Sequence, residues 1–322
     1  MKKRRIGINN IATISVLVFL VVILTILSDS FLSQKNLVNV LQQVTVNAIV
    51  AVGMTVVILT GGIDLSVGSI IALSGMIMAK LMVDLEMHAL PAMGVGLAVG
   101  ALCGLANGFF IAKCKLQPMI ATLGMMSIAR GLALTIAQGR TVSGFSMTFR
   151  WIGNASLDLG FADIPVQIFL MILIYLLMFY FLRYRRFGRY LYSIGGNEEA
   201  TRLSGISVDR YKMVAYIISG LASAVASIVM VAKLNSAIGT SGTGYELDAV
   251  AASVIGGVSL TGGFGTVWGT LLGAIIMGII KNGLNLLSVS AYLQQVVTGV
   301  IIIVAVLADA FKIRAMKKRI TE

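Results

Sequence analysis

Hydrogen-bonding side chains interrupt several long apolar stretches of this sequence. They are amides, hydroxyls and one carboxylate, at Gln43, Asn47, Thr60, Asp64, Ser66, Asn282 and Asn285. Groups of this kind can hydrogen-bond a polar molecule, but their spacing does not form a set for covalent or acid–base chemistry. Inside a membrane they must face protein or water. Together with Arg130 they are therefore candidates for a path that admits a polar, uncharged solute.

Two of the candidates carry charge within apolar segments. Asp64 follows Gly61-Gly62 and precedes a new apolar stretch, so it is predicted either to cap a helix or to contact the solute at a gate. Arg130 lies about 12 residues into its segment, or ~18 Å at 1.5 Å per residue, where snorkelling would be strained. An unpaired charge at that depth costs at least ~2.5 kcal/mol. Arg130 should therefore have a partner, and Asp64 is one candidate.

Signs of catalysis are missing from the sequence. There is no nucleophile elbow G-x-S-x-G and no phosphate-binding G-x-x-x-x-G-K-[ST]. Cys103, Cys114 and the single His88 do not form a metal-ligand pattern with the carboxylates. The sequence therefore predicts neither an enzyme nor a cofactor or metal site.

The elements that position these residues are predicted to be membrane-spanning helices. The chain has 322 residues, of which only 12% are charged and 58% are hydrophobic, and its mean hydropathy is +0.95. Because a span needs about 20 mostly apolar residues, we expect an all-α polytopic protein with ten spans, or eight if two short glycine-containing segments are excluded. The eight are 11–27, 44–60, 67–83, 89–111, 118–137, 166–182, 213–232 and 292–310, and the two short segments are 246–260 and 266–281.

The distribution of basic residues predicts the orientation. With ten spans, eighteen of the 25 Lys and Arg residues fall in 1–10, 112–117, 183–212 and 311–322, against five in the opposite loops. Cytoplasmic loops retain Lys and Arg, so both termini and the 183–212 loop are predicted to be cytoplasmic. The basic N-terminus (1–10) and C-terminus (311–322) then flank one transmembrane domain, 11–310. The net charge of +12 is explained by topology, and nucleic-acid binding is not expected.

A short polar helix is predicted within the 183–212 loop. Asn197 can cap it, Glu198 and Glu199 suit its first turn, and Gly205 can end it in a left-handed conformation. Glu198 can also pair with Arg202 four residues later. Two turns are too few for a helix to be stable alone in water. The residues allow two interpretations, a capped helix on the bilayer surface or a docking element for a cytoplasmic subunit. The residues concerned are Gly196, Asn197, Glu198, Glu199, Ala200, Thr201, Arg202, Leu203, Ser204 and Gly205.

Five motifs carry a resemblance to a known family. They are FGRYLYSIGGNEEATRLSGI at the polar helix, NAIVAVGMTVVILTGGIDLSVGSIIALSG (47–75), IATLGMMSIARG (120–131), SGTGYELDAVAASVIGG (241–257) and KNGLNLLSVSAY (281–292). The chain resembles the permease subunits of bacterial ABC importers for monosaccharides, and among these the ribose permeases most closely. It departs from the ribose pattern in GGFGTVWGTLLG, where Phe264 and Thr266 stand in place of two basic residues.

The resemblance implies a function and a set of partners. The short helix would be the coupling helix that docks onto a separate ATP-hydrolysing subunit, which would supply the stability that the helix lacks. An extracytoplasmic binding protein would deliver ribose, and a second permease copy would complete a homodimer in the lipid bilayer of the bacterial plasma (inner) membrane. Another pentose, a hexose or a small polar solute is the alternative substrate. A self-contained secondary transporter is the alternative class, and Asp64 and Arg130 are nearly its only candidates for an ion relay.

Overall fold

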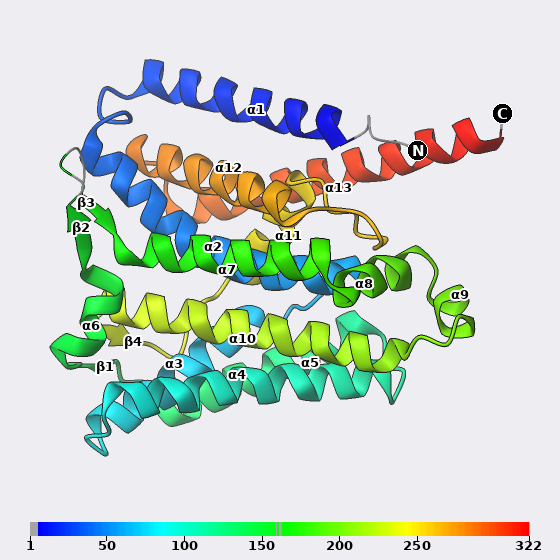
Figure 1. Ribbon diagram of the computed structural model, residues 1–322. Helices are drawn as coiled ribbons and strands as arrows, with labels where there is room; N and C mark the ends of the chain where they lie inside the picture. The colour runs from blue at the N-terminus through cyan, green and yellow to red at the C-terminus, as the bar shows by residue number, and fades with distance from the viewer. Residues whose placement is uncertain (1–5, 159, 161–162, 322) are drawn as a thin grey trace.

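The computed structural model describes residues 6–158, 160 and 163–321, which form an almost entirely helical bundle (Figure 1). The helices are α1 (Ile6–Leu27), α2 (Gln34–Leu59), α3 (Val67–Val83), α4 (Ala89–Ala112), α5 (Pro118–Ala137), α6 (Met147–Asn154), α7 (Val166–Tyr184), α8 (Arg186–Gly196), α9 (Glu198–Leu203), α10 (Val208–Leu234), α11 (Tyr245–Ile255), α12 (Val267–Leu286) and α13 (Ala291–Thr321). The short strands are β1 (Val142–Ser143), β2 (Ser156–Asp158), β3 (Asp163–Pro165) and β4 (Ser236–Ala237).

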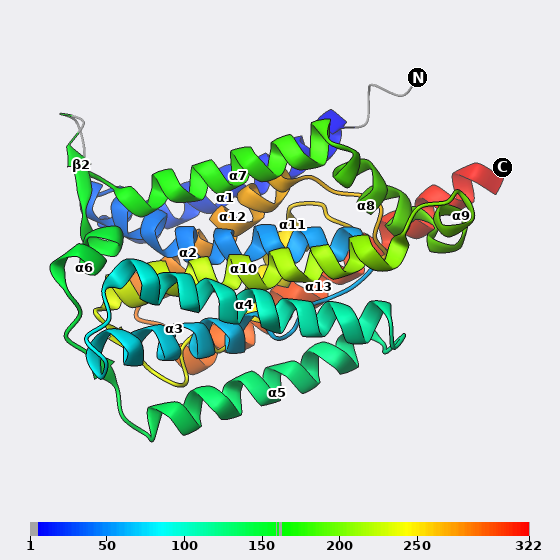
Figure 2. The ribbon, with the colours of Figure 1, turned by 60° about the horizontal axis from the view of Figure 1, so that its bottom comes forward.

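Helices α2 and α10 form the centre of the bundle. They are the two most buried of the long apolar helices, and they pack against each other, with α4 on α10 and with α11 and α12 on α2. Small residues allow the close approach of α4 and α10, since a Cβ at Gly100 would collide with the carbonyl oxygen of Gly220. Helices α5 and α13 lie at the periphery and expose apolar side chains, as Figure 2 shows for α5.

All ten predicted segments fall on helices, but they do not form ten full spans. Among the described residues, seven helices are long and apolar enough to cross a membrane, and the apolar parts of α1 and α3 are shorter. The segment predicted at 246–260 is wrong as a span, because α11 ends at Ile255 and has only 11 residues. At 1.5 Å per residue these cover ~16 Å of a hydrocarbon layer ~30 Å thick. Gly256 and Gly257 end the helix, and Gly257 has a positive φ of 85°.

The two ends of the bundle differ in character. The start of α1, helices α8 and α9 and the end of α13 lie at one end, on the right of Figure 1, whereas α6 and the four strands lie at the other. Strand β1 pairs antiparallel with β4, and β2 pairs with β3. The segments that the basic residues assign to one side of the membrane therefore share one end of the molecule.

The 183–212 loop contains two helices where the sequence predicted one. Helix α8 precedes α9 and is amphipathic, burying Gly188, Leu191 and Ile194 at intervals of three residues. Helix α8 packs against α7, α2 and α10. It therefore attaches the loop to the body of the bundle and places α9 beyond it.

Candidate functional site

A cavity of about 270 Å³ lies among α2, α10, α11, α12 and α13, toward the end of the bundle where α10 and α12 end and α13 begins. Gln42 and Gln43 reach it from the third turn of α2, Lys233 from the last turn of α10, and Asn285 from near the end of α12. Asn47 of α2, Tyr245 and Asp248 of α11, Lys281 of α12 and Gln294 of α13 complete its polar lining. The volume is near the lower limit of small-molecule sites, which is roughly 300 Å³.

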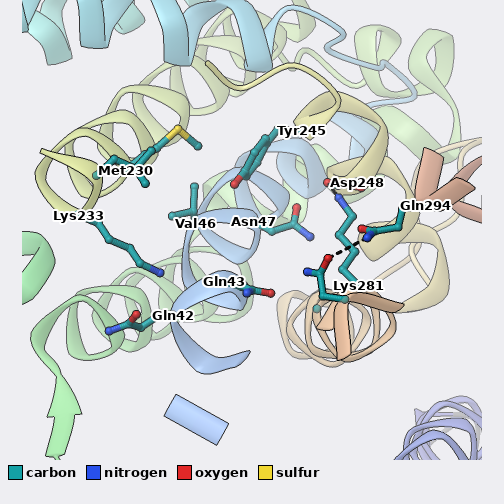
Figure 3. Close-up of a pocket in the computed structure, with 13 residues that line it drawn as sticks. Gln42, Gln43, Val46, Asn47, Met230, Lys233, Tyr245, Asp248, Lys281 and Gln294 are labelled. Carbon is teal, nitrogen blue, oxygen red and sulfur yellow. Dashed lines mark hydrogen bonds and ion pairs between the residues drawn. The ribbon is translucent and has the colours of Figure 1, made fainter. Parts of the chain in front are cut away.

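Three of the predicted path residues meet in this cavity, namely Gln43, Asn47 and Asn285. Figure 3 shows Gln43 and Asn47 on one wall and Lys281 and Gln294 on the facing wall. Asn285 is held by Gln294, whose Nε2 donates to Asn285 Oδ1 at 2.8 Å. Asn47 is only 6% exposed, and within the described part of the chain its Oδ1 accepts no hydrogen bond.

Sequence reasoning missed an ion pair in the cavity wall, formed by Lys281 Nζ and Asp248 Oδ2. The charge count from the sequence placed Lys233 and Lys281 among the five basic residues of the opposite loops. Both lie within helices, Lys233 in α10 and Lys281 in α12. A usable signal was present, because Asp248 interrupts an apolar segment just as Asp64 does. Asp64 and Arg130 were predicted from the sequence to be nearly the only candidates for an ion relay, and the Asp248–Lys281 pair adds two more charged groups to that set.

Asp64 lies away from the cavity, in a buried cluster of neutral groups. It is fully buried, and its Oδ1 accepts from Ser66 N at 3.0 Å and from Ser66 Oγ at 2.5 Å. Its Oδ2 accepts from Ser219 Oγ at 2.8 Å. Asn107 Nδ2 donates to Ser66 Oγ at 2.9 Å. The helix-cap prediction is thus half right. The cap residue of α3 is Ser66, and the Asp64 carboxylate accepts a hydrogen bond from the backbone amide of Ser66.

Asp64 and Arg130 do not form the suggested pair. Arg130 Nη1 donates to the backbone oxygens of Gly239 and Ser241, each at 2.8 Å. The guanidinium therefore fixes the chain between β4 and α11. The two backbone carbonyl dipoles compensate its positive charge, a role for which the sequence had suggested the Asp64 carboxylate.

The other predicted path residues are occupied by contacts within the protein. Thr60 Oγ1 donates to Val57 O at 2.7 Å. Asn282 and Asn36 exchange two side-chain hydrogen bonds, at 2.8 and 3.0 Å, in the buried contact of α12 with α2. Thr60, Asp64, Ser66, Arg130 and Asn282 are absent from the lining of the cavity.

The details predicted for α9 are confirmed. Asn197 Oδ1 accepts from Ala200 N at 2.9 Å, Glu198 pairs with Arg202 at 3.2 Å, and Gly205 has a positive φ of 79°. Ala200 and Leu203 are exposed, and the exposed fraction of Leu203 is 83%.

The expectation that a partner must stabilise α9 is corrected by its contacts with the rest of the chain. Lys212 Nζ donates to Glu198 Oε2 at 2.5 Å, and Arg202 pairs with Asp209 at 2.9 Å. Lys115, from the connection between α4 and α5, also pairs with Asp209 at 2.9 Å. Partial burial raises the pKa of Glu198, but the hydrogen bond and charge of Lys212, followed by those of Arg202, outweigh it and hold this pKa below its usual value.

Backbone contacts join α8 to two glycine-rich breaks between apolar helices. One break is Gly61-Gly62 after α2, and the other is the segment 256–265 between α11 and α12. Gly263 N, between α11 and α12, donates to Leu59 O at the end of α2 at 3.0 Å. A Cβ at Gly195 in α8 would collide with both of these groups. Tyr192 Oη also donates to Gly265 O at 2.9 Å. The last turn of α8 is therefore seated directly on both breaks.

In residues 6–158, 160 and 163–321, no group of three or more His, Cys, Asp or Glu side chains is placed to hold a metal ion.

The structure thus offers three candidate regions. They are the hydrogen-bonding cavity, helix α9 with its exposed apolar residues and ion pairs, and the buried polar cluster around Asp64.

Comparison with known proteins gives the family. A family profile described as "Branched-chain amino acid transport system / permease component" matches residues 36–306. The chain is 48% identical over 297 residues to the ribose import permease protein RbsC of Escherichia coli strain K12, covering 91% of each. It is 45% identical over 298 residues to RbsC of Bacillus subtilis strain 168, covering 92% of this chain and 91% of the relative.

A D-allose transport system permease protein, AlsC of E. coli strain K12, is less similar, with 39% identity over 298 residues that cover 92% of this chain and 90% of AlsC. No solved structure matches the chain significantly. The relatives and the apolar helices indicate a multi-pass protein of the plasma (inner) membrane. The chain therefore belongs to this family of transport-system permease components.

Proposed function

We propose that the chain is the membrane-spanning permease subunit of an ABC importer that translocates ribose. The observation that carries the proposal is the 48% identity to a ribose import permease over 91% of both chains. The D-allose relative is less similar, at 39%, and an L-arabinose transport system permease protein is 36% identical, which favours ribose over a hexose or another pentose. The chain is a transport component without catalysis of its own, and a separate partner hydrolyses ATP.

The exposed face of α9 is the proposed docking site for that ATP-hydrolysing partner. Leu203 and Ala200 present apolar atoms to solvent, while ion pairs to Asp209 and Lys212 fix the orientation of the helix. A preorganised helix loses little conformational entropy on binding, so more of the contact energy remains as affinity. We assign this end of the molecule, with both termini, to the cytoplasm.

The opposite end is assigned to the outer side, where a sugar-binding protein would deliver its ligand. Helix α6 and the paired strands form the surface there, and the cavity with Gln43, Asn47 and Asn285 opens at the same end. These amides would form the first part of the translocation path. A second copy of the permease completes the proposed assembly, with lipid against the exposed apolar side chains.

Two substitutions on α9 test the proposal. Leu203→Asp introduces a charge on the exposed apolar face, and Gly205→Val introduces a β-branched residue at a left-handed position. In nanodiscs, both variants should remain folded but bind the ATP-hydrolysing subunit at least tenfold more weakly, as measured by pull-down. Binding-protein-stimulated ATP hydrolysis should fall in proportion.

Gly139→Val is the matched control, because Gly139 also has a positive φ with open space around it but lies between α5 and β1. It should bind the ATP-hydrolysing subunit normally. Wild-type pull-down and hydrolysis in both α9 variants would contradict the docking assignment. Ribose uptake by this chain alone in liposomes, driven by an ion gradient, would establish a secondary transporter instead.

A further inference from the structure

The Lys281 ammonium lines the cavity, and its ion pair with Asp248 leaves it partly exposed to a ligand there. Asp248 is almost buried, with 5% of its side chain exposed, whereas the Lys281 side chain is 36% exposed. Asp248 lies in the first turn of α11, where the helix dipole favours a negative charge. The carboxylate thus anchors the ammonium from behind, and an ammonium with three donors retains capacity toward the cavity.

Across from this ammonium lies an acceptor without a donor. Asn47 Oδ1 is buried and has no hydrogen-bond partner in the described part of the chain, although its side chain lines the cavity and faces Asp248 and Lys281 in Figure 3. Buried polar atoms in proteins are nearly always hydrogen-bonded. A hydroxyl donor entering the cavity would satisfy this oxygen.

The remaining lining fits a polyhydroxylated molecule better than an ion or an apolar one. Gln43 adds an amide on the α2 wall, and Asn285 and Gln294 add a hydrogen-bonded pair of amides on the other. A hydroxyl both donates and accepts, so it can pair with the amide oxygens and with the ammonium at once. Lys233 is a second ammonium on the α10 wall, so an anion must be tested as the competing ligand.

We propose that this cavity is a monosaccharide-binding site within the permease itself, and that the Lys281 ammonium, held by Asp248, and the Asn47 amide bind sugar hydroxyls. The site rests on the proposed function, since it makes the cavity a station for the sugar after its release by the binding protein. It makes Lys281 and Asn47 substrate-binding residues and Asp248 a positioning residue.

Equilibrium binding tests the proposal directly. The permease with its ATP-hydrolysing subunit, in nanodiscs and without binding protein, is dialysed against radiolabelled ribose at micromolar to millimolar concentrations. Wild type should bind ribose saturably. Asn47→Ala should bind at least several-fold more weakly. The double variant Asp248→Asn/Lys281→Met should lose at least tenfold, because hydrogen bonds to charged groups are the stronger ones.

The double variant is chosen because it leaves no uncompensated charge, so it should assemble and melt like wild type. Lys80→Met/Asp84→Asn removes an ion pair of 2.9 Å elsewhere and should bind ribose normally. Wild-type affinity in the Asp248→Asn/Lys281→Met variant, no saturable binding by wild type, or binding of inorganic phosphate in place of ribose would each overturn the assignment. Binding-protein-dependent ribose uptake by the same preparation separately tests the transporter function, so the two proposals can fail independently.

Discussion

Asp64 and Asp248 are both buried carboxylates beside breaks in apolar helices, but their charges are compensated differently. Asp64 accepts hydrogen bonds from the Ser66 amide and from the hydroxyls of Ser66 and Ser219. Asp248 instead pairs with Lys281, whose side chain reaches a cavity.

The difference separates a structural role from a binding role. The hydrogen-bond partners of Asp64 come from the α2–α3 break, from α10 and from Asn107 of α4, whose Nδ2 lies 3.5 Å from Asp64 Oδ1, so this carboxylate joins three parts of the core. Asp248 instead pairs with a partly exposed lysine side chain that also lines a cavity of about 270 Å³. The same residue type thus acts on stability in one place and on ligands in the other.

The largest expected effect comes from Asp64→Leu. The substitution leaves the Ser66 amide and two hydroxyls without their acceptor in a buried site. At ~1–3 kcal/mol for each of these three groups, the loss is about 3–9 kcal/mol. Thermal unfolding of the purified protein in nanodiscs should show little folded material at 37 °C. Asp64→Asn, which keeps one acceptor, should be intermediate. Wild-type stability of Asp64→Leu would abolish the distinction from Asp248.

A smaller effect is expected from combining Asp64→Asn with Arg130→Gln. Arg130 donates to Gly239 and Ser241 and not to Asp64, so its loss should destabilise the chain between β4 and α11 by about 2 kcal/mol. The two unfolding free energies should add within ~0.5 kcal/mol, because the sites share no hydrogen-bond partner. A coupling energy above about 1 kcal/mol would show that the two charges interact after all.

The smallest effect concerns Glu198, an exposed carboxylate paired with cations. Its depressed pKa means that it stabilises α9 above the ordinary Glu pKa, and that this contribution is lost as the pH falls through the lower, folded-state pKa. At pH 7, Glu198→Gln should exchange the amide hydrogens of residues 200–204 about two- to fivefold faster than wild type.

Wild type and variant should converge as the pH falls through the lowered, folded-state pKa of Glu198, once both rates are corrected for intrinsic exchange. Glu199→Gln is the neighbouring control, since no ion pair of Glu199 is found in the described part of the chain. A difference between wild type and Glu198→Gln that persists unchanged in acid would contradict the role of these ion pairs.

Local signals in the sequence predicted local structure well. The Asn197 cap, the Glu198–Arg202 pair and the left-handed Gly205 depend on residues within one turn of each other, and all three are confirmed. The apolar segments also located the long helices, because length and hydropathy determine which segments suit a membrane.

Contacts between distant residues could not be read in the same way. Asp248 and Lys281 meet because α11 is too short to cross and α12 returns beside it. The predicted segment 266–281 stops at Lys281, whereas α12 continues to Leu286, so hydropathy placed Lys281 at the membrane edge and gave no sign of its contact with α11. Arg130 was assigned a carboxylate partner because side-chain charges are visible in a sequence, whereas converging backbone carbonyls such as those of Gly239 and Ser241 are not.

The seating of α8 on the two breaks has a mechanical consequence. At Gly195, Leu59 and Gly263 the contact is between backbone atoms, with no side chain that could change rotamer and absorb a displacement. A displacement of α8 must therefore move the end of α2 and the α11–α12 connection together. This contact is therefore rigid, and replacing Gly195 or Gly263 with alanine would force the three segments apart.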